Sequence, residues 1–240
     1  MNPETRDEAR KIFQELRRSS IQLKKADIVV CPPFIFLHGA REWMGKGKLL
    51  LGGQDIFWET NGAYTGEISG PMLRNAGVKF CIVGHSERRA IGETDDMINK
   101  KTKSALKAGI VPVICVGEKE RDNHGYYLAA IKKQVEHAFA GISGSALKNC
   151  IVAYEPVWAV GNKNMAIPEP RDVVEMSIFI KRTLADSHGP KRVKDLRVIY
   201  GGSANERNAA GFLKENEIAG LLVGRESLNV KKFLNMTTLA

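Results

Sequence analysis

Short apolar runs alternate with amphipathic stretches along the chain. The runs are rich in β-branched residues and little interrupted by polar ones, a pattern typical of parallel strands that are buried on both faces. Seven strands are predicted: Asp27–Cys31, Lys48–Gly52, Phe80–Val83, Val111–Val116, Ile151–Tyr154, Arg197–Tyr200 and Gly220–Val223. Helical spacing predicts helices over Asp7–Gln22, Thr94–Ala108, Tyr126–Phe139, Glu169–Ser187, Asn205–Asn216 and Asn229–Leu234.

This strict alternation over 240 residues fits one α/β domain, built as an open doubly wound sheet or as a closed barrel. A dinucleotide-binding sheet would carry a GxGxxG turn after an early strand, and none is present. A TIM (β/α)8 barrel has eight strands, and the chain opens directly into a helix. We therefore predict that residues 1–240 form a single TIM-barrel domain with seven of the eight strands encoded, the first being absent.

Composition favours a cytoplasmic protein. Hydrophobic residues make up 43% of the chain, yet no apolar run reaches the roughly 18 residues of a membrane helix, and the N-terminus is polar. The four cysteines lie in or beside apolar runs without metal-ligand spacing, as Cys31, Cys81, Cys115 and Cys150. We expect buried free thiols in a reducing compartment, no metal and no membrane.

The net charge of +9 raises the possibility of nucleic-acid binding. The Lys and Arg residues are scattered, mostly over predicted helix faces, so a solvated surface is favoured over a nucleic-acid patch. A modest positive field also favours a small anionic substrate.

Two polar residues follow predicted strands at the end where barrel enzymes hold their active sites. His85 ends the run before Ser86-Glu87-Arg88-Arg89, and Glu155 follows the strand Ile151–Tyr154. A lone His in such a place is often a hydrogen-bonded structural residue, and Glu155 has the alternative of a salt-bridged side chain beside a buried Trp158. Pro156 and Gly161 after Glu155 also fit a base followed by a hinged lid.

Glycines end the last two predicted strands, at Gly201-Gly202-Ser203 and at Gly224-Arg225. Glycine lets backbone N–H groups approach an anion closely, and barrels commonly hold phosphate after their final two strands. Either pair alone has the alternative of an ordinary turn, and the shared position of the two pairs favours phosphate.

Taken together and in this order, the motifs resemble those of the triosephosphate isomerase family. The resemblance covers nearly the whole chain. It rests on the segments Gly62–Ser69, His85–Arg89, Cys115–Glu118, Tyr154–Gly161, Tyr200–Ser203 and Leu221–Gly224.

The resemblance implies isomerisation of dihydroxyacetone phosphate and glyceraldehyde 3-phosphate, without a cofactor. Glu155 would be the catalytic base, and a neutral His85 would hydrogen-bond the enediolate oxygens. Glu87 would be a supporting residue. The phosphate would be held at Gly161, Ser203 and Gly224, with Arg225 in place of a second family glycine.

Two segments would have further roles. The lid Pro156–Ala166 would close over the intermediate and exclude water. Its tip, Asn162-Lys163-Asn164-Met165, differs from the family's usual Thr-Gly-Lys-Thr but keeps its length. The loop Asn61–Ser69 would dock into a second copy and form a homodimer, the alternative being an ordinary surface loop.

The start of the sequence departs from the family pattern. Met1-Asn2 aligns with a Met-Asn that follows a first strand and an Asn-x-Lys, and neither precedes it here. We expect a misassigned start, with a truncated gene as the alternative. Without that lysine we expect very low isomerase activity, and the alternative function is a catalytically impaired barrel that binds a phosphorylated ligand or a protein partner.

Overall fold

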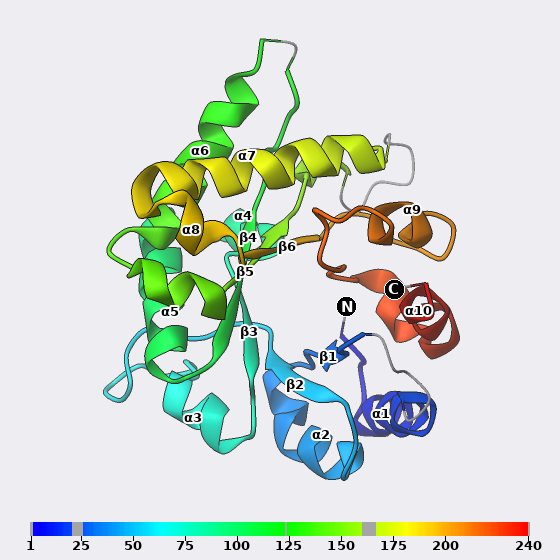
Figure 1. The fold of residues 1–240 in the computed structure, drawn as a ribbon. Helices are drawn as coiled ribbons and strands as arrows, with labels where there is room; N and C mark the ends of the chain where they lie inside the picture. Colours follow the sequence, from blue (N-terminus) through cyan, green and yellow to red (C-terminus); the bar gives the residue numbers. More distant parts are fainter. Residues whose placement is uncertain (1, 21–25, 123, 160–166, 240) are drawn as a thin grey trace.

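The computed structural model describes residues 2–20, 26–122, 124–159 and 167–239, and its sheet is parallel throughout (Figure 1). Neighbouring strands follow chain order, β1-β2-β3-β4-β5-β6. Their bounds are β1 Val29–Val30, β2 Leu50–Gly53, β3 Phe80–Val83, β4 Val111–Val116, β5 Ile151–Tyr154 and β6 Arg197–Tyr200. Four of the seven predicted strands have the predicted bounds, and the first two are shorter or shifted by up to two residues.

The seventh predicted strand, Gly220–Val223, contributes a single parallel bridge between Leu221 and Tyr200. Two backbone bonds hold it against β6: the N–H of Tyr200 donates to the carbonyl of Gly220 at 3.0 Å, and the N–H of Leu222 donates to the carbonyl of Tyr200 at 2.8 Å. This segment therefore continues the order of the sheet beyond β6.

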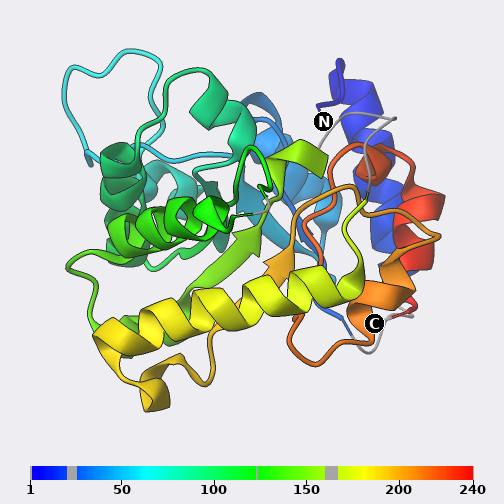
Figure 2. The same cartoon turned by 90° about the horizontal axis from the view of Figure 1, so that it is seen from above.

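Helices cover the outer face of the curled sheet (Figures 1 and 2). The larger ones agree with the predicted segments to within two or three residues at each end, apart from α9. The α-helices of the described chain are α1 Arg6–Ser20, α2 Leu37–Met44, α3 Gly70–Asn75, α4 Ser86–Ala90, α5 Asp95–Lys107, α6 Tyr126–Phe139, α7 Pro170–His188, α8 Pro190–Val193, α9 Ala209–Leu213 and α10 Val230–Thr237. The 3-10 helices are η1 Phe34–Phe36, η2 Gly144–Asn149, η3 Val157–Ala159 and η4 Arg225–Leu228.

The main apolar core lies between the helices and the sheet, and a smaller cluster of Val113, Cys115, Ile151 and Ala153 fills the inside of the curl. The four cysteines are free thiols; Cys31 is half-buried and the others are buried, which confirms the prediction for three of them. No described helix has the length and apolarity needed to cross a bilayer.

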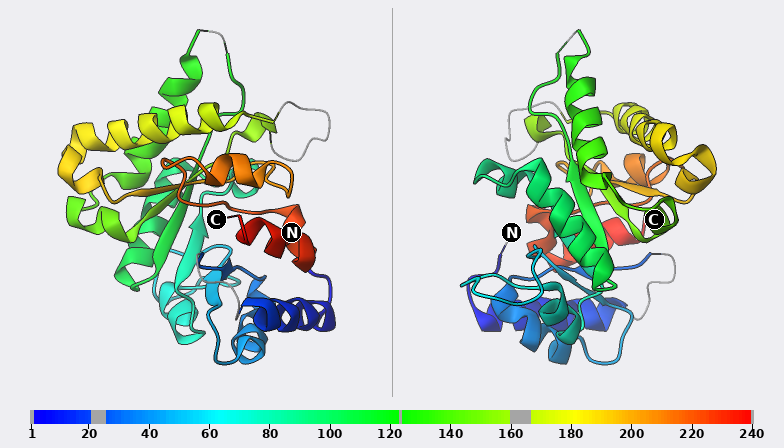
Figure 3. Two further views of the ribbon diagram at one scale, coloured as in Figure 1. Left: turned by 45° about the vertical axis from the view of Figure 1, so that its right-hand side comes forward. Right: turned by 90° about the vertical axis from the view of Figure 1, so that its left-hand side faces the viewer.

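The curled sheet is open on one side within the described residues. No strand pairing joins β1 to the segment Gly220–Val223, although α1 packs on the outside against both α2 and α10 (Figures 1 and 3). The start of the chain lies near the carboxyl end of β1, where the side-chain N–H groups of Gln54 donate to Asn2 Oδ1 at 2.8 Å and to the Cys31 carbonyl at 2.9 Å. Among the described residues, the opening therefore lies between β1 and the segment Gly220–Val223.

Candidate active site

Glu155 follows the last residue of β5 and its side chain is turned into the protein, with 2% of the residue exposed. Its Oε2 accepts a 3.1 Å hydrogen bond from the backbone N–H of Ser86, the first residue of α4. Gly201 leaves the room that this side chain occupies, because a Cβ there would lie 2.7 Å from Glu155 Cγ. Residues from the ends of β3, β5 and β6 thus hold one carboxylate.

His85 precedes α4 and faces the same carboxylate. Its Nε2 lies 3.2 Å from Glu155 Oε1, and its Nδ1 accepts the backbone N–H of Glu87 at 3.3 Å. A ring nitrogen that accepts a hydrogen bond carries no proton, so the proton of the neutral ring is on Nε2. The N–H of the imidazole therefore points to the side on which Glu155 lies.

Glu155 Oε1 is buried and accepts no hydrogen bond from the described residues. Burial raises the pKa of Glu155 above its ordinary value, and the His85 ring and the Ser86 N–H oppose that shift. A carboxylate with a raised pKa and an oxygen without a donor is a stronger base than an exposed glutamate. Beside an imidazole N–H, it is suited to take a proton from carbon while the imidazole stabilises charge on a neighbouring oxygen.

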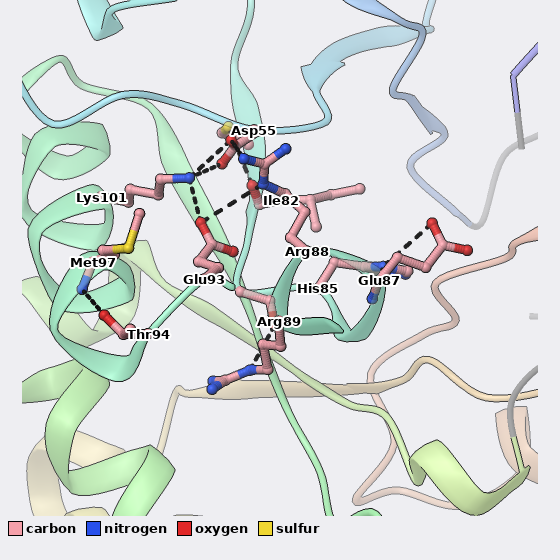
Figure 4. Close-up of polar contacts among 12 residues, drawn as sticks. Asp55, Ile82, His85, Glu87, Arg88, Arg89, Glu93, Thr94, Met97 and Lys101 are labelled. Atoms are coloured by element: carbon pink, nitrogen blue, oxygen red, sulfur yellow. Dashed lines mark hydrogen bonds and ion pairs between the residues drawn. The ribbon is translucent and has the colours of Figure 1, made fainter. Parts of the chain in front are cut away.

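The other predicted site residues have fewer contacts with the pair of Glu155 and His85. Glu87 lies beside the His85 ring, with its Oε2 3.8 Å from Nδ1, which is too long for a hydrogen bond, and its side chain is mostly exposed (Figure 4). Ser203 Oγ donates to the Ala159 carbonyl at 2.6 Å, which ties the loop after β6 to η3, the last described part of the lid. Gly161 lies outside the described residues.

Gly224 follows the Gly220–Val223 segment, and Arg225 is the first residue of η4. A Cβ on Gly224 would meet nothing within 4 Å, and the Arg225 side chain is exposed. No described residue other than glycine has a positive φ, so Arg225 occupies the place of the family glycine without backbone strain of that kind.

Sequence reasoning missed the groups that hold the strand ends in place. Gln134 on α6 makes two hydrogen bonds with the backbone of Gly117, at 2.9 and 3.0 Å. Glu118 Oε1 accepts from the Tyr154 hydroxyl at 2.8 Å and from Trp158 Nε1 at 2.7 Å, linking β4, β5 and η3. The Cys115–Glu118 motif marked this place, but its residue types alone gave no role.

A buried ionic cluster lies behind His85 (Figure 4). Lys101 Nζ is 2.8 Å from both Asp55 carboxylate oxygens and is also hydrogen-bonded to Glu93, while Arg88 Nη2 is 2.8 Å from Asp55. The cluster joins the segment after β2 to α4 and α5. The sequence carried one signal for it, because Lys101 shares the buried face of α5 with Ile98, Thr102 and Ala105.

Comparison with known proteins decides the family. The model of the family described as "Triosephosphate isomerase" matches residues 1–240. The chain belongs to the triosephosphate isomerase family. A triosephosphate isomerase of Thermoanaerobacter pseudethanolicus is 40% identical over 231 residues, 95% of this chain and 92% of its own. That of Aquifex aeolicus is 44% identical over 209 residues, 86% of this chain and 83% of its own.

Solved structures of triosephosphate isomerases share the fold. The crystal structure of the enzyme from Bartonella henselae matches with a TM-score of 0.84 and 31% identity, over 100% of this chain and 94% of that one. The TIM-barrel fold predicted from the strand pattern is therefore confirmed, and the open side of the sheet is a local feature within it.

Proposed function

We propose that the protein interconverts dihydroxyacetone phosphate and glyceraldehyde 3-phosphate, with Glu155 as base and His85 as hydrogen-bond donor. The observation that supports this most directly is the buried Oε1 of Glu155, which lies 3.2 Å from His85 Nε2 without forming a well-aligned hydrogen bond to it. An aldose–ketose isomerase needs that pair: a carboxylate that reaches two adjacent carbons and a donor for the oxygens on them.

In the forward direction Glu155 takes a proton from the hydroxymethyl carbon of dihydroxyacetone phosphate. The electron pair of the C–H bond forms the C=C bond of an enediolate, and the former carbonyl oxygen gains negative charge near His85 Nε2. The oxygen protons are redistributed and Glu155 returns a proton to the neighbouring carbon, giving the aldehyde. The reaction is redox-neutral overall and needs no cofactor.

The phosphate group would be held by backbone N–H groups at Ser203 and Gly224, together with Gly161 and Arg225. The Ser203 loop meets η3 through the Ala159 carbonyl, so the phosphate loop and the base of the lid form one unit. Glu87 has the supporting role, since its backbone N–H fixes the tautomer of His85.

The partner we propose is a second copy of the chain. The loop after β2 projects from the body, and its base is closed by the bridge between Phe57 and Ser69 (Figure 2). Tyr64 on this loop is 45% exposed. Other large apolar side chains are exposed as well: Ile35 on η1 at 81%, Ile91 after α4 at 79% and Met72 on α3 at 57%. Such exposure is typical of surfaces that are covered in an assembly.

A cytoplasmic glycolytic role fits the proposed isomerase activity.

The direct test is deuterium exchange into dihydroxyacetone phosphate in D2O, followed by NMR, together with isomerase turnover in a coupled assay. We expect both in the parent protein and neither in Glu155→Gln. The matched control is Glu120→Gln, an exposed carboxylate in the loop after β4. A parent protein that binds dihydroxyacetone phosphate but neither exchanges nor converts it would instead be the impaired phosphate binder.

Sedimentation velocity tests the homodimer. Substituting Tyr64→Asp should shift a dimer toward monomer, whereas Tyr126→Asp, at a more exposed tyrosine at the start of α6, should not. A parent protein that sediments as a monomer at all accessible concentrations contradicts the proposed partner.

A further inference from the structure

The structure contains a basic cavity at the end of the sheet away from Glu155. Its volume is about 380 Å³, within the range of small-molecule sites. Its lining includes the cations Arg41, Arg74 and Lys79 and the apolar side chains of Met44, Leu49 and Leu51. β2 begins at Leu50 and β3 begins directly after Lys79, while His85 and Glu155 follow carboxyl ends of strands. We propose that this cavity binds a small phosphate-bearing molecule with an apolar portion.

The charge of the lining is of one sign. Arg41 on α2, Arg74 on α3 and Lys79 before β3 contribute three cations, and no Asp or Glu lines the cavity. Within the described ranges none of these three side chains has a carboxylate within ion-pair distance. The three side chains are exposed at the mouth of the cavity, where they can turn toward a bound dianion and form charge-assisted hydrogen bonds with it.

One of the cations is held in place before any ligand binds. Arg41 Nη1 donates to the Asn75 carbonyl at 3.1 Å, which ties α2 to α3. Gly77 has a φ of +89°, and a Cβ there would lie 3.4 Å from Arg41 Cδ, so the side chain lies along the glycine backbone. A guanidinium has five N–H donors, and the bond to Asn75 uses one of them. The other donors are available for a phosphate.

Gly45 forms part of the rim of the cavity. The chain turns there after α2 with a φ of +56°, and a Cβ would lie 2.6 Å from the Cζ of Arg17 on α1. The position therefore has no room for a side chain, and the Gly45 amide reports on a ligand at the rim.

The floor of the cavity is apolar, which indicates that the ligand has an apolar portion beside its phosphate group. Met44, Leu49 and Leu51 line it and are buried. A free inorganic anion would leave this floor uncovered. A phosphomonoester with a compact apolar body would cover it, so the site favours such a molecule over phosphate alone.

The test is a two-dimensional amide NMR titration of the full chain with phenyl phosphate and, separately, with inorganic phosphate. We expect saturable shifts of the Gly45 and Gly77 amides, with phenyl phosphate binding at least several-fold more tightly. The amides of Gly201 and Ser203 report separately on ligand in the Glu155 site. The double variant Arg74→Gln/Lys79→Gln should weaken the binding at Gly45 and Gly77 at least tenfold.

The control is Lys133→Gln, which removes an exposed cation from α6 and should leave the titration unchanged. Each single variant, Arg74→Gln and Lys79→Gln, is titrated too, so that misfolding of the double variant does not decide the result. Shifts that do not saturate, shifts confined to Gly201 and Ser203, or equal affinity in the variants would overturn the proposal. Equally, a DNA duplex that outcompetes phenyl phosphate at Gly45 would assign the cavity to a polynucleotide instead.

Discussion

His85 Nε2 lies 3.2 Å from Oε1 of Glu155, an oxygen that accepts no hydrogen bond from the described residues. Because Nδ1 of the same ring accepts the Glu87 N–H, the proton of the neutral imidazole is on the side of the carboxylate. The two groups therefore face each other before substrate is bound. The environment of this pair leads to predictions for stability and for activity.

The first property is the dependence of stability on pH. Burial raises the pKa of Glu155, so the folded protein keeps this proton to higher pH than the unfolded chain. The free energy of unfolding contributed by Glu155 then falls as pH rises from the ordinary glutamate pKa through the raised one. We expect Glu155→Gln to be inactive yet more stable than the parent near pH 7, with the difference shrinking toward pH 4. Urea denaturation at several pH values measures this, and a variant less stable at every pH contradicts it.

The second concerns the space beside the base. Gly201→Ala places a methyl group 2.7 Å from Glu155 Cγ, so the carboxylate has to move. A displacement of about 1 Å costs about a hundredfold in rate, and we expect kcat to fall by that order while the protein stays folded. Gly47→Ala is the control, since its Cβ would meet only the Met44 carbonyl at 3.6 Å. Steady-state kinetics measure kcat of both variants, and circular dichroism shows whether each is folded.

The third concerns the buried cluster behind His85. Lys101 is 1% exposed and stands between Asp55 and Glu93. Lys101→Met leaves two buried carboxylates with Arg88 as their remaining described cation, and we expect a loss of about 3–5 kcal/mol in the free energy of unfolding. The triple variant that also carries Asp55→Asn and Glu93→Gln should recover most of that loss. Equal stability of Lys101→Met and the parent would show that the cluster is not held as ions.

The sequence predicted most of the sheet because short β-branched apolar runs, separated by amphipathic helices, are typical of parallel strands that are buried on both faces. β3 to β6 have the predicted bounds, whereas β1 covers only Val29–Val30 of its predicted run. The segment Asn205–Asn216 was predicted as helix, but only Ala209–Leu213 is α-helical. Side-chain oxygens of Asn205 and Asn208 accept backbone N–H groups within this stretch and hold it in turns.

In the site, too, some features were predicted from the sequence and others were not. Glu155 and His85 were predicted because each ends a strand, and the structure brings them together as two neighbours across the sheet. Their roles stay predictions, as do those of Glu87, Ser203, Gly224 and Arg225. The pairing of Lys101 with Asp55 was not predicted, because 46 residues separate them and nothing local records the contact.

Two glycines border the base, and together they restrict how this protein can evolve. A Cβ at Gly117 would fall 1.8 Å from the Glu155 carbonyl oxygen, and one at Gly201 would fall against its side chain. A side chain at Gly117 would have to displace the backbone of Glu155, and one at Gly201 would have to displace its carboxylate, so either change lowers activity before any second mutation can compensate. A saturation library selected for isomerase activity should therefore be strongly depleted of other amino acids at both positions.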